Sequence, residues 1–239
     1  MQRSSWMRLA AVAAVALGVT SCTKAEGEHN GETMASNPAM SDSATYRIVF
    51  RSSWTPERHP VDYPPDGAIS GPHFSGIIGT THNSGYTLFA DMRLPTPGLE
   101  RLSEEGRHSP LDEEIRTAVT AGTAGMLFET GGLRDFGDSL VVEVRADRDH
   151  PMLSLAAMIA PSPDWFTGIS NLPLMENGSW ITGRTLMLNA WDSGGDDGVT
   201  YRAADRDNNP KKPTMQAATR HFVVNGAAVP VATVTITKI

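Results

Sequence analysis

The sequence predicts an all-β fold, an antiparallel β-sandwich that also carries two short helices. Three observations lead to this prediction: apolar and polar residues alternate over several segments, turn residues separate those segments, and strands do not alternate with long helices. The 239 residues include 22 Gly and 16 Pro, which is typical of a fold with many turns. With 40% apolar side chains, the chain can also bury a core.

Strand patterns recur from Tyr46 to the end of the chain. In a strand, successive side chains point to opposite faces, so alternation of apolar and polar residues indicates one buried face. Asn225-Gly226 predicts a hairpin, because both central residues of a type I′ turn need positive φ. The alternating strands place Tyr46, Ile48 and Phe50, and Ala232, Val234 and Ile236, on one face, and the segments Leu140 to Val144 and Met152 to Ile159 are runs rich in apolar or β-branched residues.

Two segments between the predicted strands have helix start and stop signals. Thr96-Pro97 opens the first and Gly106 follows its end, while Ser109-Pro110 opens the second and Gly122 ends it. Acidic residues near both starts suit the positive end of a helix dipole. We expect these helices to be decoration between the strands.

The amino-terminal region predicts export and a lipid anchor. Residues 1–21 form a signal peptide, in which Arg3 and Arg8 come before a short apolar run that cannot span a bilayer. The residues before Cys22 resemble a bacterial lipobox, so Cys22 is the predicted lipidation site. As the only cysteine, Cys22 also excludes a disulfide framework and a thiolate metal cluster.

The rest of the chain divides into a tether and one folded domain. Residues 22–45 are polar and rich in small residues, which predicts a flexible tether, and residues 46–239 form the sandwich. Thr23 stands where an inner-membrane retention signal would place Asp, so we expect anchoring in the cell envelope, at the outer membrane or surface. Without Arg3 and Arg8 the formal charge changes from −7 to −9, which argues against nucleic acid as a partner.

Two acidic turns are the candidate metal site. Asp164 lies in the segment Pro161 to Gly168, and Asp192 and Asp196 lie in the segment Trp191 to Gly198. Calcium takes six to eight oxygen ligands, which carboxylates and carbonyls of glycine-containing loops supply well. The alternative is that both segments are ordinary acidic turns in water. The Asp spacing does not match an EF-hand loop.

These motifs resemble the amino-terminal domain of the spondins, extracellular matrix proteins of the F-spondin type. The resemblance covers residues 46–239 and depends on two strings, PSPDWFTGIS and WDSGGDDGVTY, with FRSSW and GPHFS before them and VATVTITKI after them. It implies a β-sandwich similar to calcium-dependent phospholipid-binding domains. It also implies one structural calcium ion with ligands at Asp164, Asp192 and Asp196, completed by backbone carbonyls.

The chain departs from that family at several positions. Where the family has WDAGTDSG, this sequence has Ser193, Gly195 and Asp197, so Asp197 could replace Asp196 as a ligand or stay in water. The cysteine bridges and thrombospondin repeats of the animal proteins are missing, which puts the animal partners in doubt more than the fold.

The functional hypothesis is a non-enzymatic binding or adhesion module that contacts a surface or matrix protein or a glycan, with the membrane as a second partner through the lipid anchor. The alternative is a metal-assisted hydrolase of the cell envelope, but the sequence has no G-x-S-x-G elbow or metallopeptidase helix. A third reading is calcium-dependent membrane contact near Lys211 and Lys212. We expect Trp165 and Trp191 to be core residues, and His73, His82 and His150 to be hydrogen-bonded structural residues.

Overall fold

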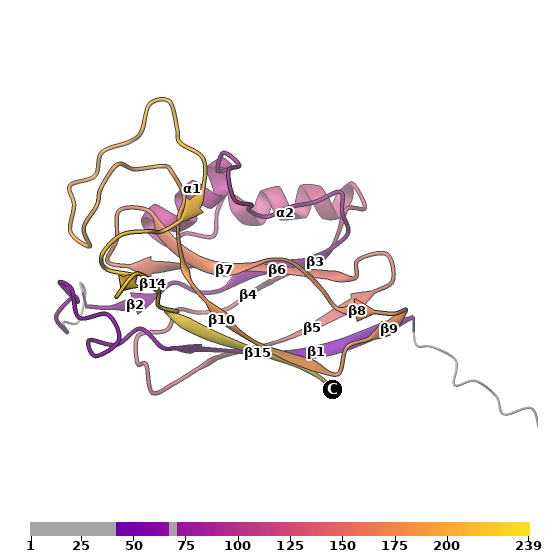
Figure 1. Ribbon diagram of the computed structural model, residues 1–239. Helices are drawn as coiled ribbons and strands as arrows, with labels where there is room; N and C mark the ends of the chain where they lie inside the picture. The colour runs from indigo at the N-terminus through magenta and orange to yellow at the C-terminus, as the bar shows by residue number, and fades with distance from the viewer. Residues whose placement is uncertain (1–41, 67–70) are drawn as a thin grey trace, which may run out of the picture. The chain divides into compact units, whose positions relative to one another are not determined.

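The computed structural model describes residues 42–66 and 71–239. The predicted signal peptide, Cys22 and the tether up to residue 41 lie outside the described residues. Two antiparallel sheets face each other, and two helices cover the outer side of one of them (Figure 1). In the described part of the chain, no helix is both long and apolar enough to cross a membrane.

The smaller sheet has four strands in the order β10-β15-β1-β5. Its inner face follows the alternation seen in the sequence: Tyr46, Ile48 and Phe50 are completely buried, and Val234 and Ile236 pair beside them. The strands predicted at the two ends of the folded domain are therefore confirmed, and the structure adds that they lie side by side. The strand bounds are β1 (Ser43–Ser52), β5 (Leu140–Asp147), β10 (Gly183–Leu188) and β15 (Ala232–Lys238).

The larger sheet has seven strands in the order β12-β11-β7-β6-β3-β4, with β2 paired to β6. Its strands are β2 (His73–Phe74), β3 (Ile78–His82), β4 (Ala124–Glu129), β6 (Met152–Ala160), β7 (Trp165–Pro173), β11 (Ala190–Asp192) and β12 (Met215–Gln216). Two small hairpins complete the fold: β8 (Met175–Glu176) with β9 (Ser179–Trp180), and β13 (Val223–Val224) with β14 (Ala227–Ala228). The second is the hairpin predicted from Asn225-Gly226, whose φ angles are 52° and 79°.

The helices begin and end close to their sequence signals. Helix α1 (Pro97–Glu105) is capped by Thr96, whose Oγ1 accepts a hydrogen bond from the N–H of Leu99 at 3.2 Å. It ends at Gly106, where φ is 68°, a value that glycine adopts without steric strain. Helix α2 (Leu111–Thr120) follows Pro110 and has no side-chain cap.

The prediction that the helices are decoration is wrong. Leu99, Leu102, Leu111 and Ile115 of the two helices are at most 1% exposed and pack on the larger sheet in a second apolar cluster. The main core lies between the sheets, where Leu153 and Leu155 of β6 point, while Ala156 points to the helices. Because both of its faces are covered, β6 is buried from Leu153 to Ala160 and is apolar except for Ser154, so the expectation of one buried face per sheet fails for this sheet.

Candidate functional site

Sheet register brings two predicted aspartates together at one end of the larger sheet. Asp164 lies between β6 and β7, directly before Trp165, and Asp192 is the last residue of β11. Strand β11 pairs antiparallel with β7 so that Asp192 lies opposite Trp165, and the N–H of Ser193 donates to the Asp164 carbonyl at 3.2 Å. Two residues that are 28 positions apart thus share one edge.

The Asp164 side chain is completely buried in a group of N–H and O–H donors. Its Oδ2 accepts hydrogen bonds from Ser193 Oγ at 3.0 Å and from the N–H groups of Gly194, Gly195 and Asp196 at 2.9, 2.9 and 3.2 Å. Its Oδ1 is equally buried but has no hydrogen-bond partner. A buried carboxylate oxygen without a partner is unfavourable, so this atom is suited to a cation.

Asp192 shares a donor with Asp164. The N–H of Gly194 lies 3.0 Å from Asp192 Oδ1 and 2.9 Å from Asp164 Oδ2, so the two carboxylates converge. Burial, followed by the nearby charge of Asp192, raises the pKa of Asp164 to about 6. Burial also raises the pKa of Asp192, while the Gly194 N–H, Trp165 and the charge of Lys212 partly offset it. Two carboxylates that lie close together in a buried site repel each other, and a divalent cation would neutralise both.

Asp196, the third predicted ligand, is only 4% exposed, but its side chain holds the loop. Its Oδ1 accepts from the N–H of Gly198 at 2.6 Å, and its Oδ2 accepts from the N–H of Arg206. The neighbouring Asp197 accepts from Arg206 Nε at 2.6 Å at the surface. Both acids therefore have protein partners, unlike Oδ1 of Asp164.

The loop between β11 and β12 is tightly folded at its glycines. Gly194 has φ of 86°, and a Cβ there would lie 2.1 Å from the carbonyl oxygen of Lys212. Asn208 Nδ2 donates to the carbonyls of Gly194 and Asp196 at 3.1 and 2.8 Å, and its N–H donates to the Gly195 carbonyl at 2.7 Å. These three loop carbonyls thus already accept hydrogen bonds from Asn208.

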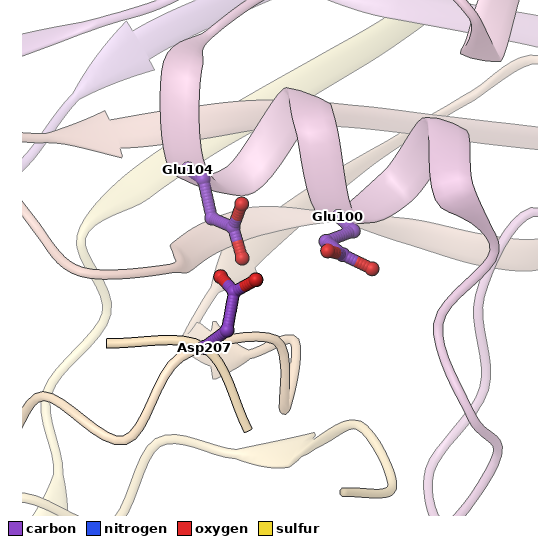
Figure 2. A group of neighbouring side chains, drawn as sticks. All are labelled: Glu100, Glu104 and Asp207. Carbon is purple, nitrogen blue, oxygen red and sulfur yellow. The ribbon is translucent and has the colours of Figure 1, made fainter. Parts of the chain in front are cut away.

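Helix α1 adds acidic groups that the sequence analysis did not assign to the site. Glu100, Glu104 and Asp207 each offer a carboxylate oxygen, and these atoms all lie within 4.8 Å of one another (Figure 2). Lys211 Nζ lies 2.7 Å from Glu100 Oε1 and 3.8 Å from Asp207 Oδ2. The spacing of Glu100 and Glu104, one helical turn apart, was a usable signal for one acidic face. That they lie near Asp207 depends on the tertiary structure, and the sequence does not show it.

The aromatic and histidine residues have structural contacts. Trp165 is completely buried and contacts Tyr201 and Phe222, and Trp191 is half-buried against Phe89. His73, His82 and His150 are each hydrogen-bonded, as predicted.

The pair His82 and Ser154 has the kind of contact that a hydrolase would need. His82 Nε2 lies 2.8 Å from Ser154 Oγ, but both side chains are completely buried. A substrate cannot reach this pair, so it gives no support to the hydrolase alternative.

The fold and the site define a class of protein: an antiparallel β-sandwich whose candidate site lies in acidic loops at one end of a sheet. Residues 44–226 match the family model of the spondin amino-terminal domain, Spondin_N. The chain therefore belongs to that family, as the motifs around Asp164 and Asp192 predicted.

Two animal relatives illustrate the extent of the similarity. The chain is 31% identical over 182 residues to Spondin-1 of Homo sapiens, an alignment that covers 72% of this chain and 21% of Spondin-1. It is 28% identical over 176 residues to Spondin-2 of Homo sapiens, covering 72% of this chain and 50% of Spondin-2. The chain thus spans a fifth to a half of these relatives.

Proposed function

We propose that this protein is a lipid-anchored binding or adhesion module of the bacterial cell envelope whose spondin-type domain is stabilised by one calcium ion. The observation that carries the proposal is the convergence of the buried Asp164 and Asp192 carboxylates on one N–H at the rim of the sheet. Membership of the spondin family supports a binding role, because the motifs resemble those of extracellular matrix proteins of the F-spondin type, and the family model and Spondin-1 both match this chain.

Calcium is the cation that suits this donor set. Among the described residues, the groups that act on Asp164 and Asp192 include no thiolate or imidazole, and carboxylate oxygens favour a hard divalent ion. In this proposal Asp164 Oδ1 and Asp192 bind the ion directly. Asp196 holds the loop through its hydrogen bonds, and it becomes a ligand only if its side chain rotates toward the ion. The ion's role is structural: it would neutralise the buried charges and hold the β6–β7 and β11–β12 connections together.

Lipidation of Cys22 would place this module at the membrane, with the outer membrane or cell surface as its location. A diacylated cysteine gives a stable anchor, where one acyl chain gives only marginal binding. The folded domain begins at β1 (Ser43), which leaves about 20 residues of polar tether for reach. The partner in this proposal is a surface or matrix protein or a glycan.

The calcium proposal is tested by thermal unfolding of the purified domain with EGTA and with 2 mM calcium. With an affinity typical of extracellular modules, about 0.1 mM, calcium at this concentration adds about 1.8 kcal/mol, which raises the Tm of a domain of this size by about 4–7 °C. Asp192→Asn should abolish the shift, and Asp197→Asn, a matched change at the neighbouring surface acid, should keep it. An equal shift in the wild type and Asp192→Asn would show that the ion binds elsewhere.

The anchor and the partner need separate tests. Incorporation of labelled palmitate by bacteria that express the full chain should disappear in Cys22→Ala, and labelling that persists would remove the lipid anchor from the proposal. Retention of envelope glycans or surface proteins by the immobilised domain should fall with EGTA and in Asp192→Asn. If neither EGTA nor Asp192→Asn changes retention, partner binding does not depend on the calcium site.

A further inference from the structure

Glu104 carries a buried carboxylate oxygen without a hydrogen-bond partner. In the acidic group of Figure 2, the Lys211 ammonium pairs with Glu100 and lies near Asp207. The third member, Glu104, makes no ion pair with Lys211 in the described structure, and its Oε1 is buried without a hydrogen-bond partner. The single charge of Lys211 is therefore shared by three acidic groups, and Glu104 is the one that makes no direct contact with it.

Gly195 is buried and has no side chain, which lets Glu104 come close to the Asp164 loop. The N–H of Gly195 donates to Asp164 Oδ2 at 2.9 Å, and a Cβ built on Gly195 would lie 2.4 Å from Glu104 Oε1. Any larger residue at position 195 would displace the Glu104 carboxylate.

A small cavity gives access to this region. Its volume is about 210 Å³, and its lining includes Glu104, Glu105, Asp205 and the residues Ser162 and Pro163 that precede Asp164. The three acids that line it give a cation a negatively charged approach to Glu104.

We propose that Glu104 is a further carboxylate ligand of the cation that Asp164 and Asp192 bind, so that one ion ties helix α1 to the acidic loops. This inference rests on the proposed calcium site and adds a ligand that the sequence motifs do not contain. Two completely buried, unpartnered oxygens, Asp164 Oδ1 and Glu104 Oε1, support it. Asp196, in contrast, uses both of its oxygens to hold the loop.

The test is a calcium titration by calorimetry, with terbium luminescence excited through the nearby tryptophans as a second readout. Glu104→Gln keeps the size of the side chain and removes its charge, and it should weaken calcium binding by at least about tenfold, because ligand charge sets affinity at such sites. Glu143→Gln is the control: its partner is Arg47 on the exposed face of the smaller sheet, outside the cavity, and it should bind calcium like the wild type.

Hydrogen exchange distinguishes a ligand from a distant charge. If the ion joins α1 to the loops, calcium should slow amide exchange in residues 99–105 of the wild type and not of Glu104→Gln. Gly195→Ala should act in the same direction, because the added methyl group takes the place of the Glu104 carboxylate, and its affinity for calcium should also fall.

The outcomes separate this inference from the proposed site. If Glu104→Gln binds calcium within twofold of the wild type while Asp192→Asn does not bind, Glu104 is not a ligand and the calcium site stands. Unchanged exchange in α1 on calcium addition would also overturn the role of Glu104. If the wild type binds neither calcium nor terbium, both proposals fail.

Discussion

At the scale of single residues, hydrogen-bond partners decide what each acid can do. The sequence motifs predict Asp164, Asp192 and Asp196 equally as calcium ligands, but the structure gives them different hydrogen-bond partners. Asp164 combines four donors on Oδ2 with none on Oδ1, whereas Asp196 closes a turn with both oxygens. Charge alone thus does not identify a ligand; a buried oxygen without a partner does so better.

The raised pKa values predict how the calcium-free domain responds to pH. Burial and Glu100 raise the pKa of Glu104 to about 7, and Asp164 reaches about 6, against ordinary values of 4.5 and 3.8. The folded state therefore holds more protons than the unfolded state between about pH 4 and 7, and these acids lower the free energy of unfolding as pH rises through that window.

The measurement is urea unfolding in calcium-free buffer at pH 5.0 and 7.5 for the wild type and Glu104→Gln. The wild type should lose more stability than the variant over this interval, because the variant has no proton to release at position 104. Burial lowers the pKa values of His59 and His82, so these two groups make the free energy of unfolding rise with pH. Their contribution is the same in both proteins. Parallel pH profiles would show that Glu104 has an ordinary pKa.

At the scale of elements, short local signals set the boundaries of the helices and hairpins. Thr96 and Gly106 frame α1, and Asn225-Gly226 forms the turn between β13 and β14, each for a backbone reason visible within a few residues. What these signals do not show is the surface that an element covers. Helix α1 has a buried face because the larger sheet lies beneath it, and its acidic face meets the β11–β12 loop.

The cap of α1 gives a prediction at this scale. Thr96→Ala removes the acceptor for the N–H of Leu99 and should destabilise the domain by about 1 kcal/mol. Thr117→Ala, an exposed substitution within α2, should stay within about 0.5 kcal/mol of the wild type. Chemical denaturation of both variants checks this, and equal midpoints for the two would show that the cap does not stabilise the helix.

At the scale of the whole molecule, the domain has two apolar clusters with the larger sheet between them. Because β6 contributes side chains to both clusters, loss of the helix layer should also disturb the sandwich. The same arrangement couples the site to the fold: Asp164 follows β6, Asp192 ends β11, and Glu104 lies on α1. An ion held by all three would bridge the helix layer and the sheet.

This coupling predicts cooperative unfolding. Leu102→Ala in the helix layer and Leu153→Ala between the sheets should each destabilise the domain by about 2–5 kcal/mol, in one transition with an unchanged m-value. Val141→Ala on the exposed face of β5 should change stability by less than about 0.5 kcal/mol. A separate early transition in Leu102→Ala would show that the helices unfold on their own.

The sequence by itself determined the all-β class, the first and last strands of the domain, the helix ends, the hairpin and the spondin family, because each depends on alternation, capping or a short motif along the chain. Only the tertiary structure decided that the helices bury a second core, that Asp196 turns to Gly198 and Arg206, and that Glu104 lies beside the Asp164 loop. These features depend on which segments meet in space, and sheet register and helix packing set that across distances no local pattern encodes.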